Sequence, residues 1–162
     1  MRLAAGLIML VLFAVWGCRK SGILKRRCML LQELRLMLEQ YSIEISCIAP
    51  TLEELAKQGS GEFGAILREC AQGTSDIRRA WSAAVEQLAA LPHCGAEEAE
   101  VLSQLGQALG TCPAESELSL LRLYSARLDK LCEQAEKISE KKGRLYRSGG
   151  VLAGLGAAVL LL

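Results

Sequence analysis

Two apolar stretches stand near opposite ends of this 162-residue chain, and each is bordered on its inner side by basic residues. They cover residues 3–17 and 149–162. As α-helices each would extend about 22 Å, because a helix rises about 1.5 Å per residue, whereas the hydrocarbon core of a bilayer is about 30 Å thick. Local thinning of the bilayer can absorb such a difference. We therefore expect two short transmembrane segments, at residues 1–18 and 148–162.

Basic residues predict the orientation of both segments. Membrane proteins keep Lys and Arg on the cytoplasmic side, and here these residues follow the first apolar stretch and precede the second. Both flanks therefore place residues 19–147 in the cytoplasm, with the chain ends across the membrane. The flanking residues are Arg19, Lys20, Lys25, Arg26, Arg27, Lys141, Lys142, Arg144 and Arg147.

An alternative interpretation treats the N-terminal stretch as an export signal. Val15-Trp16-Gly17-Cys18 resembles a loose lipoprotein cleavage box, which would make the chain an exported, lipid-anchored helical binding protein with Cys18 as its lipidation site. Trp16 fits such a box poorly, and the cations after Cys18 oppose translocation. A retained span with an ordinary thiol at Cys18 is the preferred hypothesis.

Charge is distributed unevenly, although the formal net charge is only +1. Residues 1–27 carry six basic and no acidic groups, residues 28–136 carry eight basic and seventeen acidic groups, and residues 137–162 carry five basic and one acidic group. Because a nucleic-acid-binding domain needs a basic patch on its folded body, the acidic central region argues against a nucleic-acid partner.

The central region shows helical periodicity and no sustained strand pattern. A first long helix is expected from Arg19 to Ile48, ended by Pro50. A last one begins at Pro113 and meets no proline before the C-terminus, so it can continue into the second apolar stretch. Shorter helices are expected at 50–58, 60–72 after a Ser60 cap, 74–91 and 95–109.

Both long helices carry apolar residues that recur every seven positions. In the first helix these are Leu24, Leu31, Leu38 and Ile45, and Leu34, Tyr41 and Ile48; in the last they are Leu121, Leu128 and Ala135, and Tyr124, Leu131, Ile138 and Leu145.

These elements predict an all-α fold. The first long helix leaves the membrane and the last returns to it, so the two should lie antiparallel, and their seven-residue repeats favour left-handed packing. We expect a cytoplasmic bundle of about six helices flanked by N- and C-terminal membrane helices.

Catalytic and cofactor signatures are sparse. The single histidine, His93, stands in a Pro-His-Cys-Gly turn and is expected to be solvent-exposed, and residues 59–64 are expected to form a flexible glycine-rich connector. No C-x-x-C pair or phosphate-binding loop occurs, so the sequence predicts no metal, no cofactor and no enzymatic activity. The cysteines are expected to be reduced and buried: Cys18, Cys28, Cys47, Cys70, Cys94, Cys112 and Cys132.

Two further sets of residues are candidates for contacts. Gly150 and Gly154 form a G-x-x-x-G pair of the kind that lets membrane helices approach closely, although incidental glycine remains an equal alternative. Glu97, Glu98 and Glu100 form an acidic cluster that we expect to be solvated, since carboxylates are favourable in the first turn of a helix. This cluster is the candidate docking surface for a partner.

The segment from Lys141 to Leu155 contains Y-R-S-x-G-V-L-x-G. With Ala80-Trp81, the stretch 102–110 and the first helix at 30–48, it makes nearly the whole chain resemble the stage III sporulation protein AB family of endospore-forming bacteria. Pro113 and Glu117 stand where that family usually has Asp and Gln.

The resemblance implies a fold similar to the cytoplasmic helical domain of the inner-membrane platform proteins of type II secretion and type IV pilus systems. It also implies a non-enzymatic scaffold role in the channel that joins mother cell and forespore, within the mother-cell membrane around the forespore. The implied partners are the companion secretion-type ATPase and other channel membrane proteins of the same operon. Self-association into a homo-oligomer stays open.

Overall fold

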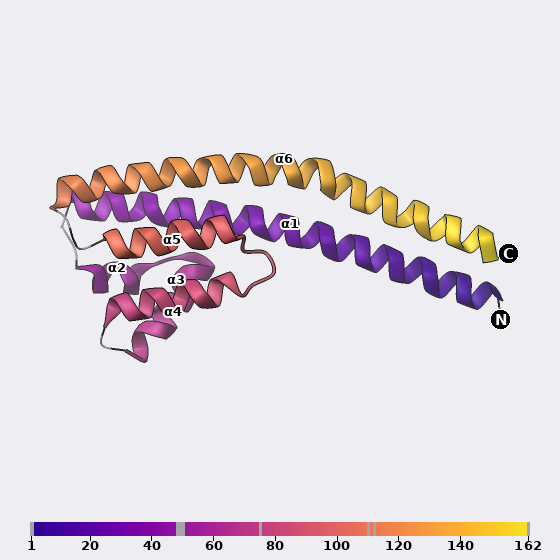
Figure 1. Ribbon diagram of the computed structural model, residues 1–162, viewed down its shortest axis with the longest axis horizontal. Coiled ribbons are helices and arrows are strands. Elements are labelled where there is room, and N and C mark those ends of the chain that lie inside the picture. The colour runs from indigo at the N-terminus through magenta and orange to yellow at the C-terminus, as the bar shows by residue number, and fades with distance from the viewer. Residues whose placement is uncertain (1, 48–50, 75, 110, 112, 162) are drawn as a thin grey trace. The chain divides into compact units, whose positions relative to one another are not determined.

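Helices account for every regular element in the described part of the chain (Figure 1), which confirms the predicted all-α class. The computed structural model describes the backbone at residues 2–47, 51–74, 76–109, 111 and 113–161, and the side chains there except at 2–14, 16–18, 52, 114 and 143–161. The described residues form α1 Arg2–Cys47, α2 Leu52–Gln58, α3 Gly61–Gln72, α4 Ile77–Ala89, α5 Ala96–Ala108 and α6 Ala114–Leu161.

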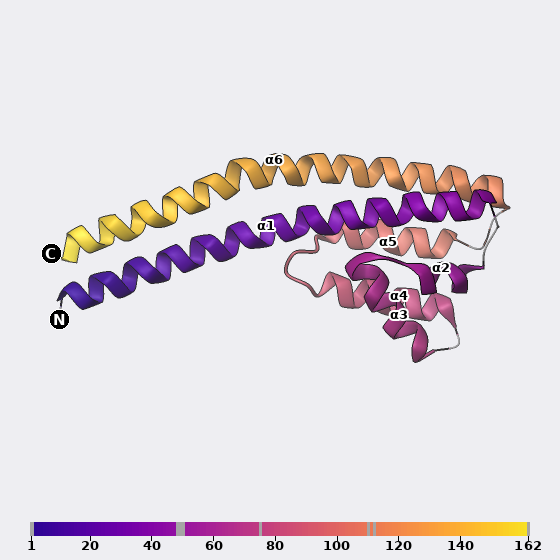
Figure 2. The same ribbon diagram turned by 180° about the vertical axis from the view of Figure 1, so that it is seen from behind.

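The structure divides into two compact units, which are described separately. The two-helix unit combines Met1–Cys28 with Gln134–Leu162, and the bundle unit comprises Met29–Glu133. Within each unit the segments of α1 and α6 lie side by side and run in opposite directions (Figures 1 and 2). This arrangement agrees with the antiparallel long helices expected from the sequence.

Both long helices are continuous through the apolar stretches. α1 begins at Arg2, so the first apolar stretch and the predicted first long helix form one helix, and α6 continues from Ala114 to Leu161. Within the residues that the structure describes, no helix is both long and apolar enough to cross a bilayer. The predicted spans at 1–18 and 148–162 fall mainly on positions whose side chains lie outside that description.

Residues of the predicted seven-residue repeats form the core of the bundle unit. The side chains buried there include Leu31, Leu34, Leu38, Tyr41 and Ile45 from α1 and Leu121, Tyr124, Leu128 and Leu131 from α6. Ala135 is likewise buried, in the two-helix unit, where Leu24 and Ile138 are half-buried. Ile48 and Leu145 lie outside the described side chains. The seven-residue pattern therefore identified the inward faces of both long helices.

Polar contacts connect the helices of the bundle unit to one another. The Tyr41 hydroxyl of α1 donates to the Leu55 carbonyl of α2 at 2.9 Å, and the Arg35 guanidinium meets the Asp129 carboxylate of α6 at 2.8 Å. α4 packs against α3 and α5, while α2 packs against α3 and α4. The Trp81 indole N–H completes this packing by donating to the Leu102 carbonyl of α5 at 2.8 Å.

The glycine-rich segment between α2 and α3 is a close-packed turn, so the prediction of a flexible connector is wrong. Gly59 and Gly64 are buried, and a Cβ on Gly64 would collide with the Gly59 carbonyl. Gly61 has φ +80°, a conformation that side-chain-bearing residues rarely adopt. The glycines are needed here because the two backbones approach each other directly.

Several helix ends differ by a few residues from the predicted ones. α2 begins at Leu52, where Thr51 and Glu54 form a reciprocal capping box, rather than at Pro50. α4 ends at Ala89 rather than Leu91. Ser60 occupies the cap position of α3 but makes no side-chain capping bond.

Candidate functional site

The basic residues that flank the apolar stretches lie in the two-helix unit. We call them the basic collar: Arg19, Lys20, Lys25, Arg26, Arg27, Lys141, Lys142, Arg144 and Arg147. Six of them are exposed, namely Arg19, Lys20, Lys25, Arg26, Lys141 and Lys142. Arg27 is half-buried, and the side chains of Arg144 and Arg147 lie outside the described residues. The fold thus brings two charge clusters more than a hundred residues apart in sequence into one compact unit.

A contact between Cys28 and Ser139 indicates which positions of the two helices in this unit lie at the same level. The Ser139 hydroxyl hydrogen-bonds the Cys28 thiol across the helix pair. Because the helices are antiparallel, Lys25, three residues before Cys28, stands level with Lys142, three residues after Ser139. By the same count, Lys20 is level with position 147. At about 1.5 Å per residue, the basic collar is about 12 Å deep.

The acidic cluster does not form a single exposed surface. Glu97 and Glu100 are exposed on α5, whereas Glu98 is fully buried, with a relative exposure of 0%. The expectation that Glu98 is solvated is therefore wrong, and Glu98 cannot belong to a docking surface. Its position explains its burial, because Val101, Leu102 and Leu105 follow at the spacing of one helix face.

Glu100 is also part of a contact between helices. Its carboxylate accepts from the Gln104 side-chain amide at 3.0 Å, and the oxygen of the same amide accepts from the Arg127 guanidinium of α6 at 2.9 Å. The chain of contacts is exposed. Of the three predicted docking carboxylates, Glu97 is exposed and has no hydrogen bond or ion pair to another residue in the described part of the chain. Glu100 has a structural role beside any docking role.

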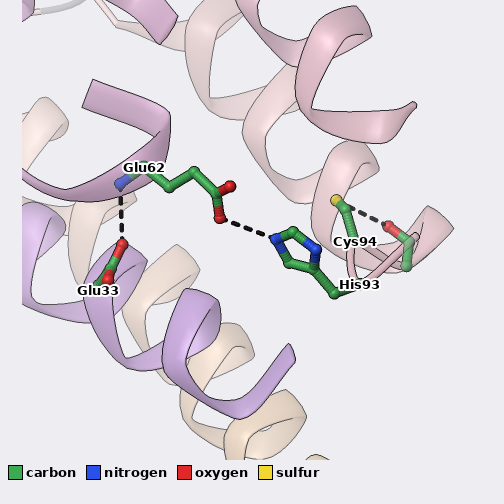
Figure 3. A network of polar contacts seen from close by, with 5 residues as sticks. Glu33, Glu62, His93 and Cys94 are labelled. Carbon is green, nitrogen blue, oxygen red and sulfur yellow. Dashed lines mark hydrogen bonds and ion pairs between the residues drawn. The ribbon is translucent and has the colours of Figure 1, made fainter. Parts of the chain in front are cut away.

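His93 is buried and takes part in a polar network, so its predicted exposure is wrong (Figure 3). Its side chain is 5% exposed, and its Nε2 lies 2.8 Å from Oε2 of Glu62 in the first turn of α3. The Glu62 backbone N–H in turn donates to the Glu33 carboxylate of α1 at 2.8 Å. The network therefore links α1, the start of α3 and the loop before α5.

Glu33 performs the capping role that the sequence assigned to Ser60. The first N–H groups of a helix have no partner within it, and a carboxylate there also interacts favourably with the helix dipole. Since Glu33 is 29 residues away from Glu62 along the chain, no local sequence motif predicts the contact. The geometry of this network is that of a structural contact: the imidazole meets a carboxylate, while the thiol of the neighbouring Cys94 donates to the Gly95 carbonyl.

The cysteines are less buried than expected. Among the described ones, Cys47 is exposed and Cys28, Cys70, Cys94 and Cys132 are half-buried, and no disulfide joins any of the five. Burial raises the pKa of the Cys28 thiol, and Glu136 adds to this, which outweighs the lowering by Ser139 and Arg27. Burial, with a further contribution from Glu69, likewise raises the pKa of Cys70. Both thiols are therefore protonated at neutral pH.

An exposed apolar stripe on α1 was missed in the sequence. Met29, Leu36 and Ile43 are 53%, 61% and 58% exposed and are spaced by seven residues in the bundle unit. The spacing was visible as a third apolar repeat beside the two seams that form the core. Sequence periodicity alone does not tell which of three parallel repeats faces outward.

The described surface offers little for metal or acid–base chemistry. No group of three His, Cys, Asp or Glu side chains that could hold a metal ion is found among the residues that the structure describes. A surface hollow of about 320 Å³ is lined by Glu53, Lys57, Ala71, Thr74 and Ile77. Its two charged groups are exposed, so it provides neither a desolvated base nor an activated nucleophile.

The G-x-x-x-G pair lies within the C-terminal part of α6. Gly150 and Gly154 are both helical, but their surroundings fall outside the described side chains. Their role in packing between membrane helices stays a prediction.

Comparison with known proteins gives two matches. The family model described as stage III sporulation protein AB matches residues 2–162. The chain is also 25% identical over 166 residues to the stage III sporulation protein AB of Bacillus subtilis (strain 168), with 97% of each sequence covered. No solved structure matches this chain.

Proposed function

The chain belongs to the stage III sporulation protein AB family, and from this premise we propose that it is a non-enzymatic membrane scaffold of the channel between mother cell and forespore. The family supports a role in sporulation. The observation that carries the membrane part of the proposal is the basic collar, because cations from both chain ends gather in one unit directly beside the two apolar stretches. That is the charge pattern of two spans with a common cytoplasmic side.

In the proposed topology the bundle unit lies in the cytoplasm of the mother cell, at the membrane around the forespore. This unit carries the acidic excess of the chain, so its charge favours a basic partner surface over the anionic lipid headgroups. The proposed partners are the companion secretion-type ATPase and other channel proteins of the same operon, with a second copy of this chain as a further candidate.

A reporter fusion tests the topology. Gly73 is exposed between α3 and α4, where an added Cβ would have Cys70 O at 3.7 Å as its nearest neighbour, so insertion there should be tolerated. We expect green fluorescent protein inserted at Gly73 to be fluorescent in the membrane fraction and alkaline phosphatase at the same site to be inactive. Active phosphatase would contradict the proposal. Fatty-acid labelling that disappears in Cys18→Ser would instead favour the exported lipoprotein.

Docking of the ATPase is tested on α5. We expect Glu97→Lys with Glu100→Lys to reduce recovery of the ATPase from sporulating cells while membrane insertion is unchanged, because the reversal removes two exposed negative charges. The matched control reverses Glu69 and Glu86, which are equally exposed but lie on α3 and α4. Equal recovery with both variants would exclude this surface of α5.

A further inference from the structure

Six exposed cations of the basic collar have no ion-pair partner in the described structure. They are Arg19, Lys20, Lys25, Arg26, Lys141 and Lys142, and no ion pair joins any of them to another residue that the structure describes. Arg35 in the bundle unit, by contrast, pairs with Asp129 at 2.8 Å. Between positions 137 and 147, Glu140 is the single acidic residue. These six residues therefore carry a concentrated positive charge.

These cations are spread over both helices instead of converging on one point. At about 100° per residue, Arg19, Lys20, Lys25 and Arg26 are distributed around most of the circumference of α1. Lys141 and Lys142 extend the charge onto α6 at the level of Arg26 and Lys25. A site for a soluble phosphate needs convergent donors in a concave setting, whereas this distribution suits several separate phosphates.

We propose that the basic collar binds the phosphate groups of anionic phospholipids, such as phosphatidylglycerol, in the leaflet that faces the bundle unit. The proposal rests on the proposed membrane topology and adds a lipid preference to it. The collar borders the inner end of each apolar stretch without any intervening acidic residue, which places its charges at headgroup depth when those stretches are in the bilayer. Each Lys or Arg near an anionic surface strengthens binding about fivefold.

The test uses the full-length protein in nanodiscs made of equal parts phosphatidylglycerol and phosphatidylcholine. Native mass spectrometry of the released protein measures the ratio of the two lipids that remain bound. The collar variant replaces Lys20, Lys25, Lys141 and Lys142 with Gln. The control variant replaces Lys57, Arg78, Arg122 and Lys130 with Gln, which removes the same number of exposed cations from the bundle unit.

We expect the wild type and the control variant to retain phosphatidylglycerol at least tenfold over phosphatidylcholine, and the collar variant to lose most of this preference. High salt should weaken the preference, because exposed charges are screened. Equal lipid ratios for wild type and collar variant would overturn the inference. So would full displacement of the lipid by inorganic phosphate at matched ionic strength, since that outcome indicates a soluble-phosphate site.

An error in the proposed membrane topology would give a different result from an error in the lipid-binding proposal. In nanodiscs of phosphatidylcholine alone, the wild type and the collar variant should both insert through their apolar stretches. Absence of the wild type from these neutral nanodiscs would contradict the membrane proposal and the collar proposal with it. Insertion of both proteins with no difference in lipid preference would contradict the collar proposal alone.

Discussion

Nε2 of His93 lies 2.8 Å from Oε2 of Glu62, and this contact joins the loop after α4 to the first turn of α3. The same glutamate presents its backbone N–H to Glu33 of α1. A single residue of α3 thus connects two segments that are 29 and 31 residues away from it along the chain. Figure 3 shows both contacts converging on Glu62.

We expect His93→Ala to lower the free energy of unfolding by about 1.5–3 kcal/mol, the usual range for a hydrogen bond to a charged group. The Glu62 carboxylate is 43% exposed and can bind water in place of the imidazole, so the lower end of this range is expected. Thermal unfolding of the full-length protein in detergent, followed by circular dichroism, measures the change. Glu86→Gln, an exposed carboxylate on α4, is the control and should change little. An unchanged midpoint for His93→Ala would show that the network has no stabilising role.

Gly106→Ala should destabilise the bundle unit by about 1–3 kcal/mol, as over-packed cores do. An added Cβ at Gly106 would collide with the indole ring of Trp81, whose N–H is held by the Leu102 carbonyl. Gly73→Ala is the matched control, because its Cβ would meet nothing closer than the Cys70 carbonyl at 3.7 Å. The control should be neutral or stabilise by up to about 1 kcal/mol. Equal effects of the two substitutions in urea unfolding would contradict the packing argument.

Leu38→Ala and Leu36→Ala should differ strongly although both change the same helix. Leu38 is 1% exposed in the core and Leu36 is 61% exposed on the apolar stripe. We expect the first substitution to lower the free energy of unfolding by about 2–5 kcal/mol and the second to change it by less than about 0.5 kcal/mol. A large loss for Leu36→Ala in purified protein would indicate that the stripe is covered by a second copy.

We expect ionisation of Tyr41 to lower the stability of the protein at alkaline pH. Burial, with a smaller contribution from Glu44, raises the pKa of its hydroxyl well above the ordinary value of about 10. Because the folded-state pKa is the higher one, the stability linked to neutral Tyr41 is complete below pH about 10 and is lost as the pH rises above it. The effect should appear as a falling free energy of unfolding in alkaline buffers.

Tyr41→Phe removes this titration together with the hydrogen bond to the Leu55 carbonyl. The variant should be less stable than wild type by about 0.5–1.5 kcal/mol at neutral pH, the usual net contribution of one hydrogen bond, because the Leu55 carbonyl keeps its bond from the Gly59 N–H. The difference between the two proteins should then shrink above pH about 10. Parallel pH profiles across the alkaline range, measured by urea unfolding, would show that Tyr41 is not the titrating group.

Periodicity predicted the helices and their buried faces well because both depend on local spacing. Leu31, Leu38 and Ile45 repeat every seven residues and are all buried. The same rule, applied to α5, would have identified Glu98 as inward-facing, since it precedes Val101 and Leu102 by three and four positions. The error arose from judging a carboxylate by its chemistry instead of by its position.

The environment of His93 could not be predicted from local spacing. Its partner is 31 residues away, and nothing in the Pro-His-Cys-Gly turn specifies that α3 starts beside it. The exposed stripe of Met29, Leu36 and Ile43 posed a similar problem, because its spacing equals that of the core repeats. Which of the three repeats faces outward depends on where the other helices of the bundle unit pack, and that is a property of the whole bundle.

The setting of Trp81 makes it an internal optical probe. Its indole is 2% exposed, lies edge-on to the Phe63 ring with centroids 5.1 Å apart, and donates to a backbone carbonyl. One rigid, asymmetric chromophore of this kind gives a near-ultraviolet dichroism signal that vanishes when the surrounding helices separate. Packing of the short helices against one another can therefore be followed in the unlabelled protein, independently of whether α1 and α6 remain helical.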